Sequence, residues 1–301
     1  MPATMPPKDS EQTNAIEWPT MLVMLLTYAF WLSLTWWHAT FPVAILVVAL
    51  GTLIALHSSL QHEVIHGHPT PWQPFNTVMA FPALGLAVPY QRYEILHLQH
   101  HRNWLLTDPY DDSESYFLAN AQWCRCNKVI QALLNVNNTL LGRLTIGPII
   151  MLVRMCFTEL SESKYSADVK IAWAWHAAGM ALVLTWLWLV QFPVVVYLCA
   201  AYFGISLLML RSYGEHLPEH NTDHRSAIIK SNAFMRLLYL NNNFHRVHHD
   251  HPEVAWYKLP SLYHAHYKQH TVHVYKGYFS LFKRFALKPR YPVEHPFLGK
   301  D

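Results

Sequence analysis

Four long apolar stretches constrain this chain more than any other feature of its sequence. They cover about residues 19–37, 41–56, 171–190 and 192–210. Each approaches the roughly 20 residues that a helix needs to cross a hydrocarbon core about 30 Å thick, although the second stretch is short. The composition, 52% hydrophobic and only 14% charged, agrees with a chain that lies in a membrane. The sequence therefore predicts four transmembrane helices.

The four stretches form two pairs, because very few residues separate the members of each pair. Residues 38–40 join the first two stretches, and Gln191 joins the last two. Connections this short join antiparallel neighbours, so each pair should form a hairpin that enters the membrane and returns to the same side. Two weaker apolar stretches, residues 75–90 and 140–157, contain prolines and arginines and are expected to be interfacial or buried. A count of six spans stays open.

Two hairpins would place everything else on one side of the membrane. Every Lys and Arg lies in the N-terminal tail or in residues 57–170 and 211–301, whereas the hairpin turns hold none. By the positive-inside rule, that side is cytoplasmic.

The expected fold is therefore an all-α integral membrane protein, with a helical cytoplasmic cap on two transmembrane hairpins. We expect a disordered tail at residues 1–18, a membrane domain at 19–282 and a C-terminal tail at 283–301. Within the membrane domain, the cap comprises residues 57–170 and 211–282.

Histidines form three groups with helical spacing. The groups read HEVIH, HLQHH and HRVHH, and their histidines are His62 and His66, then His97, His100 and His101, and then His245, His248 and His249. Single histidines such as His38, His176 and His295 are ordinary polar or interfacial residues in most proteins. Clustering of eight has no packing advantage, and neutral imidazole binds borderline metals well. The pattern therefore predicts a metal site.

The predicted topology allows the three groups to meet, because two hairpins put all of them on the same membrane face. Eight imidazoles exceed the three or four protein ligands of one zinc ion, so two metal ions are indicated. A set of nitrogen ligands with open positions suits iron that reacts with O2.

The three groups, their spacing and the two hairpins resemble the membrane fatty-acid desaturases and the related hydroxylases and carotenoid ketolases. The histidine boxes of that family read HxxxH, HxxHH and HxxHH, and the resemblance covers about residues 19–262. It implies that the eight box histidines ligate two irons. It also implies one further histidine after the last span, for which RSYGEHLPEH offers His216, with His220 as the competitor.

Polar residues beside the boxes are candidates for a supporting role. The resemblance implies that an asparagine before the third box, Asn241 or Asn243, orients a bound water, unless it is an ordinary turn residue. In LTDPYDDSESY, after the second box, a carboxylate can accept the free N–H of a ligating histidine, or can instead cap a helix or lie in solvent. The candidates there are Asp108, Asp111, Asp112 and Glu114.

By resemblance, the chain is an oxidoreductase that uses O2 and two iron ions (Fe2+/Fe3+) to introduce a double bond into a fatty-acyl or similar lipid-like chain. Hydroxylation or ketolation of a carotenoid or a small specialised metabolite is the alternative within the same superfamily. Two electrons must come from a separate ferredoxin or cytochrome b5-like donor with its reductase, because the sequence has no nucleotide-binding glycine loop and no fused haem domain. No basic run with interleaved aromatics indicates nucleic acid.

A different class of enzyme competes through the first box. HEVIH also matches HExxH, in which two histidines hold zinc and Glu63 would be the general base of an intramembrane peptidase. That reading leaves both HxxHH groups unexplained. A metal transporter or store fits less well, because the spans hold almost no ionisable residue beyond His176.

Overall fold

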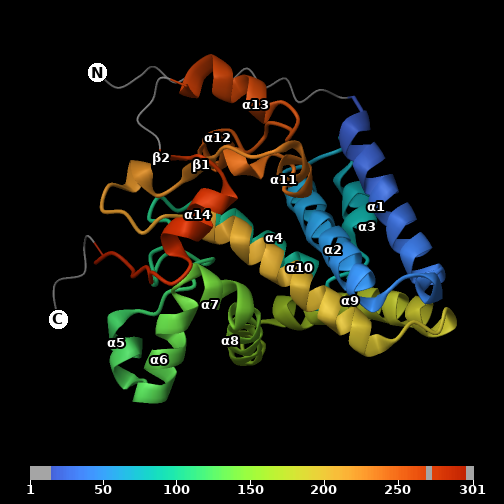
Figure 1. Ribbon diagram of the computed structural model, residues 1–301, viewed down its shortest axis with the longest axis horizontal. Helices are drawn as coiled ribbons and strands as arrows, with labels where there is room; N and C mark the ends of the chain where they lie inside the picture. Colours follow the sequence, from blue (N-terminus) through green and yellow to red (C-terminus); the bar gives the residue numbers. More distant parts are fainter. Residues whose placement is uncertain (1–14, 269–272, 296–301) are drawn as a thin grey trace.

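The computed structural model, which describes residues 15–268 and 273–295, is mostly helical (Figure 1). Residues 1–14 and 296–301 of the two predicted tails lie outside the described residues. The helices are α1 Trp18–Trp36, α2 Val43–Ile65, α3 Gln73–Ala80, α4 Tyr90–His101, α5 Asn120–Arg125, α6 Lys128–Asn137, α7 Leu140–Thr145, α8 Gly147–Glu162, α9 Ala167–Leu189, α10 Val194–Glu215, α11 Ala233–Leu238, α12 His245–Asp250, α13 Leu259–Leu262 and α14 Tyr278–Phe285. Short turns of helix are η1 His38–Thr40, η2 Thr222–His224, η3 Asn242–Phe244 and η4 Tyr263–Tyr267, and the strands are β1 Ala227–Ile229 and β2 His273–Tyr275.

Four helices are long and apolar enough to cross a membrane: α1, α2, α9 and α10. This confirms the prediction of four long apolar helices. Helix α2 continues nine residues past the expected end of its span, to Ile65, because the sequence offers no helix breaker before Gly67, which has a φ of +92°. The extension carries the first histidine box out of the apolar stretch as part of the same rigid helix.

The four helices form two hairpins, α1–α2 and α9–α10, and Figure 1 shows both turns at the same end of the molecule. Helices α2 and α10 cross closely, because Gly51 and Gly204 face each other. A Cβ on Gly204 would lie 2.9 Å from the Gly51 carbonyl oxygen. The close crossing fixes the direction in which both helices leave the apolar layer.

Buried polar groups between the hairpins are paired, as an apolar surrounding requires. The Trp31 indole N–H donates to the Tyr197 hydroxyl (3.0 Å), which in turn donates to the Leu84 carbonyl (2.8 Å). These bonds join α1, α10 and the segment before α4.

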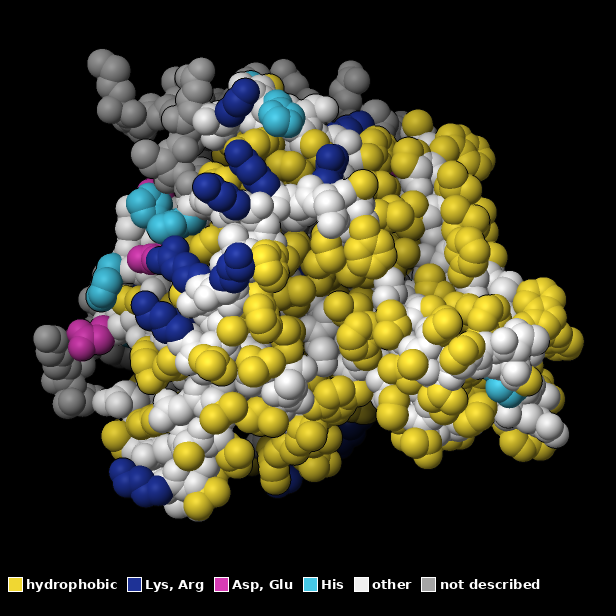
Figure 2. Space-filling model, in the orientation of Figure 1, with side chains coloured by type: hydrophobic (Ala, Val, Ile, Leu, Met, Phe, Trp, Pro, Cys, Tyr) yellow, Lys and Arg dark blue, Asp and Glu magenta, His cyan; other side chains and the backbone are white. Residues whose placement is uncertain are grey.

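Large apolar side chains cover the outside of the hairpins (Figure 2). Examples are Leu25 on α1, Val48 on α2, and Leu182 and Trp188 on α9, of which Trp188 is 76% exposed. Lys and Arg gather on the other part of the face drawn in Figure 2. An exposed apolar surface of this extent, on helices long enough to cross a membrane, is suited to contact with lipid.

The remaining elements form a cap at the end of the bundle where α2 and α10 finish. Within it, β1 and β2 pair in parallel, with Ala227 opposite His273 and Ile229 opposite Tyr275. The pair ties the segment before the third histidine box to the segment after it. Helix α14 runs three residues past the expected domain end at residue 282, because Leu281 and Phe285 pack in the cap core.

Candidate metal centre

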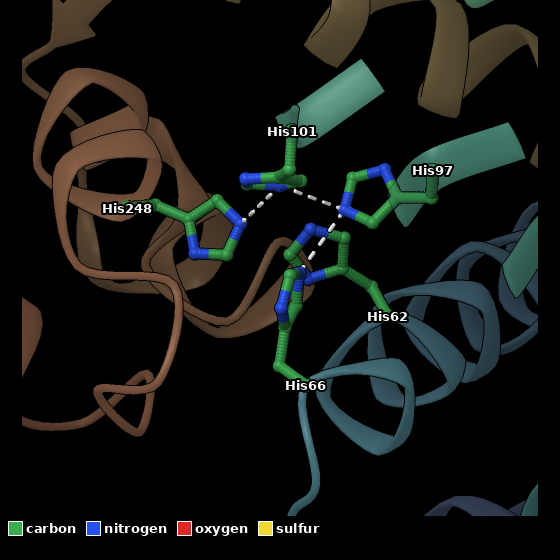
Figure 3. Close-up of side chains that lie close together, drawn as sticks. All are labelled: His62, His66, His97, His101 and His248. Carbon is green, nitrogen blue, oxygen red and sulfur yellow. Dashed lines mark hydrogen bonds between the residues drawn. The ribbon is translucent and has the colours of Figure 1, made fainter. Parts of the chain in front are cut away.

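Five histidines from three helices converge in a first group (Figure 3). They are His62 and His66 at the end of α2, His97 and His101 on α4, and His248 on α12. Their candidate ligand atoms all lie within 4.8 Å of one another. The i, i+4 spacing in α2 and in α4 places both members of each pair on one helix face.

Four more histidines form a second group beside the first. They are His100 on α4, His216 directly after α10, and His245 and His249 on α12. The two groups adjoin, because the rings of His101 and His249 stack with centroids 4.3 Å apart. In each HxxHH motif, the first and last histidines therefore lie in one group, and the middle histidine lies in the other.

Within both groups the Nε2 atoms face one another at short range. The distances are 3.1 Å for His66–His97, 3.0 Å for His101–His97, 3.1 Å for His248–His101, 3.0 Å for His100–His216, 3.2 Å for His100–His249, 2.8 Å for His245–His216 and 3.0 Å for His249–His245. Nitrogens bound at about 2.1 Å in neighbouring positions of one ion are about 3 Å apart. The spacing is that of ligands around a metal.

Three outer ring nitrogens contact oxygen acceptors. Nδ1 of His100 lies 2.7 Å from Asp112 Oδ1, Nδ1 of His97 lies 2.8 Å from Glu114 Oε1, and Nδ1 of His245 lies 3.3 Å from Asn242 Oδ1. A neutral ring that donates from Nδ1 has only a lone pair on Nε2. Such a lone pair at Nε2, directed into the group, is what a metal ion would bind.

The surroundings keep most of these imidazoles neutral, which is the form that binds metal. Burial and the neighbouring histidines lower the pKa of His101 to about 2 and the pKa of His216 to about 3. His100 differs: burial alone would lower its pKa, but the Glu114 and Asp112 carboxylates outweigh burial and raise it to about 9. Without a metal, His100 is therefore the imidazole that holds a proton.

Of the two candidates for the ninth histidine, His216 is buried within the second group, whereas His220 is exposed. Among the acidic candidates, Asp112 and Glu114 reach ring nitrogens of the groups. Asp108 and Asp111 contact other groups than the ring nitrogens for which they were candidates. Asp108 Oδ1 accepts the backbone N–H groups of Tyr110 and Asp111, and Asp111 pairs with His295.

The asparagines before the third box also contact other groups than expected. Asn241, with a φ of +53°, donates to the Trp256 carbonyl, and Asn243 donates to the Ile229 carbonyl at 2.7 Å. The middle residue of the run, Asn242, is the one that faces His245. The left-handed turn at Asn241 directs the three side chains differently, and repetition of asparagine in the sequence gives no signal that distinguishes them.

A buried ion pair at the end of α10 supports Asn242, and sequence reasoning missed it. Asn242 Nδ2 lies 3.3 Å from Glu215 Oε2, which also lies 3.3 Å from Arg211 Nε. Glu215 is fully buried, and its Oε2 lies 3.6 Å from Nδ1 of His245. The available signal was the i, i+4 spacing of Arg211 and Glu215 directly before His216.

Glu63 does not occupy the position of a peptidase base. The carboxylate is buried, and its Oε2 accepts the backbone N–H of Trp256 at 3.2 Å. His62 and His66 share their group with three further histidines, which a zinc peptidase does not need. The arrangement therefore favours two adjacent nitrogen-rich metal sites over a single zinc site.

The residues present fit a pair of metal ions. Six of the nine histidines are buried, and the buried Nε2 of His62 has no hydrogen-bond partner among the described residues. A buried orphan nitrogen is costly unless a ligand completes it. Each group can hold one metal ion, with an outer layer of carboxylates and an amide that fixes the rings.

Comparison with known proteins agrees with this geometry. No curated protein matches the chain. The model of the family described as "Fatty acid desaturase" matches residues 35–280, a range that includes all nine histidines, the whole of α2, α9 and α10, and only the end of α1. The chain therefore belongs to the fatty acid desaturase family.

Proposed function

We propose that this protein is an O2-dependent di-iron desaturase that introduces a double bond into a fatty-acyl or similar lipid-like chain. Family membership makes it an oxidoreductase and suggests a lipid substrate. The observation that carries the proposal is the convergence of nine imidazoles in two adjacent groups. A nitrogen set of this size exceeds the needs of one zinc ion and suits two irons with open positions.

The nine histidines would hold the two irons, five in the first group and four in the second. When bound, the irons supply the oxidation of an unactivated C–H bond by O2. Asp112, Glu114 and Asn242 would keep the rings of His100, His97 and His245 in the right tautomer and orientation. The buried setting would exclude water from the reaction.

The balance of the reaction implies a partner. Desaturation removes two hydrogens from neighbouring carbons, and reduction of O2 to two waters needs two further electrons and two protons. We infer that a ferredoxin or cytochrome b5-like protein, with its reductase, supplies the electrons. Because the hairpin turns carry no Lys or Arg, the cap would face the cytoplasm, where such donors operate.

Lipid analysis of cells that express the chain tests the proposal. Cells with the wild type should accumulate acyl chains that have lost two hydrogens, and cells with His248→Ala should not. The matched control is His38→Ala, because His38 lies in a hairpin turn and contacts the Thr35 carbonyl instead of the histidine groups. Products that gain oxygen would support the hydroxylase or ketolase alternative and contradict desaturation. An unchanged lipid profile from iron-loaded wild type with an electron donor would overturn both.

A further inference from the structure

A third group of candidate ligands lies outside the histidine cage: Asp108, Asp111 and His295. One candidate ligand atom from each residue lies within 4.8 Å of the others. Two of these residues come from the loop after the second histidine box, and His295 comes from the C-terminal segment, 184 positions from Asp111.

Asp108 is the unusual member, because its side chain is buried and only half satisfied. It is 2% exposed. Its Oδ1 accepts the backbone N–H groups of Tyr110 (2.9 Å) and Asp111 (3.2 Å), whereas its buried Oδ2 has no hydrogen-bond partner among the described residues. A buried carboxylate oxygen without a partner is rare and points to a missing ligand.

The other two members are already in contact. His295 Nε2 lies 3.0 Å from Asp111 Oδ2, and the Asp111 side chain is 46% exposed. This contact alone is an ordinary ion pair, but it involves only the Asp111 carboxylate and not that of Asp108. Two carboxylates this close repel each other, and a single imidazole cannot offset two negative charges.

The nearby buried cation, Arg225, binds elsewhere. Its Nε donates to the Glu219 carbonyl (2.7 Å) and its Nη1 to the Leu106 carbonyl (2.9 Å). Within the described residues, no ion pair of 4 Å or less joins Arg225 to Asp108. The charge of Arg225 therefore acts on Asp108 only from a distance, and Asp108 Oδ2 has no hydrogen-bond partner among the described residues.

We propose that Asp108, Asp111 and His295 bind one divalent metal ion, separate from the two histidine groups. Two carboxylate oxygens and one imidazole nitrogen suit Mn2+ or Zn2+ better than Ca2+ or Mg2+, which prefer oxygen ligands alone. The exposed side of the site leaves room for water to complete the coordination. The proposal does not depend on the nature of the reaction.

The ion would fasten the C-terminal segment to the loop that supports the second box. On the loop side, Asp112 donates its backbone N–H to the Asp108 carbonyl (3.1 Å), and the Asp112 side chain contacts His100. On the C-terminal side, Arg290 Nη1 donates to the Tyr213 carbonyl (2.6 Å) and its backbone N–H donates to the Asn138 carbonyl (3.0 Å). Occupancy should therefore stabilise the fold around His100.

Titration of the purified iron-loaded protein with Mn2+, followed by electron paramagnetic resonance of the free ion, tests the site. The wild type should bind about one Mn2+ per chain, and Zn2+ should displace it. Asp111→Asn and His295→Ala should each weaken binding at least about tenfold, a loss of about 1.4 kcal/mol. The thermal midpoint of the wild type should rise with Mn2+, and those of the two variants should not.

His273→Ala is the matched control, because His273 lies 3.8 Å from Glu219 in a histidine–carboxylate pair that has a single carboxylate. It should bind Mn2+ as the wild type does. Iron content measured before and after titration shows whether the histidine groups have exchanged their metal. The proposal fails if the wild type binds neither Mn2+ nor Zn2+, if Asp111→Asn and His295→Ala bind equally well, or if each Mn2+ taken up releases one iron.

Discussion

The carboxylate of Asp112 lies 2.7 Å from Nδ1 of His100, and its second oxygen accepts the backbone N–H of Thr107, also at 2.7 Å. The side chain is buried and held from both sides. His100 can therefore present only Nε2 to the second histidine group. Asp112 sets both the tautomer and the direction of this ring.

Replacement of Asp112 with Asn should lower iron retention and turnover about 10- to 100-fold, because the amide has no charge to stabilise the His100 ring. Iron per chain after size exclusion, and desaturation by the same sample, measure the effect. Asp223→Asn removes an exposed aspartate outside the histidine groups and should leave both quantities unchanged. Full iron content in Asp112→Asn would show that Asp112 is not needed to orient the His100 ring.

Asn242 and Asn243 should respond differently to replacement, although they are neighbours of the same type. Asn242→Ala removes the acceptor for His245 Nδ1 and should lower iron content. Asn243→Ala removes the donor to the Ile229 carbonyl and should lower the unfolding temperature, with iron per folded chain unchanged. Thermal unfolding and elemental analysis on the same samples separate the two effects. Equal loss of iron in both variants would contradict the assignment of Asn242.

The metal-free protein should lose stability as the pH rises from about 6.5 to about 9. Burial opposes protonation of His100, but Glu114 and Asp112 outweigh it and raise its pKa to about 9. A group whose pKa is higher in the folded state stabilises the fold fully below its ordinary pKa, about 6.5, and loses this contribution as the pH passes its folded pKa. Thermal midpoints measured after iron removal across this range test the prediction.

The same pH range should have the opposite effect on iron binding, because the ligating imidazoles must be neutral. Iron retention should therefore improve as the pH rises above about 6.5. Asp112→Asn should flatten the decline of the metal-free protein. A decline of equal slope in wild type and variant would show that another group is responsible.

The crossing of α2 and α10 should not tolerate a larger residue at Gly204. A Cβ there would lie 2.9 Å from the Gly51 carbonyl oxygen and 2.9 Å from Ile54 Cγ2. Gly204→Ala should cost about 1–3 kcal/mol through overpacking. It should also lower iron content, because α2 carries His62 and α10 leads to His216. Gly85→Ala is the control, since its Cβ would meet Ile54 Cγ2 at an ordinary 3.5 Å.

The sequence was sufficient to predict the features that depend on helical periodicity and apolar length. Spacing of three and four residues identified the eight box histidines, and short turns between apolar stretches identified the hairpins. The structure brings all eight together with His216 in two groups. Their role as iron ligands stays a prediction that metal analysis must test.

Other features depend on contacts between distant segments, which periodicity does not encode. In TDPYDDSE the sequence alone does not distinguish one acidic residue from another. Only the folded loop shows that Asp112 points toward His100 and Asp111 toward His295. The pairing of β1 with β2 joins two three-residue strands whose paired residues are 46 positions apart, and strands this short have no pattern that the sequence reveals. Helix α2 continues to Ile65 because its residues favour a helix, whereas the thickness of the membrane determines only the length of the apolar part of that helix.

The metal content of the protein, purified in mild detergent and measured by elemental analysis per chain, is the decisive test of the two proposed iron sites. If both histidine groups hold iron, the wild type should contain about two irons per chain, and His100→Ala and His248→Ala, which remove one histidine from each group, should lose much of it. One zinc and no iron after an iron-replete, anaerobic preparation would contradict the proposal.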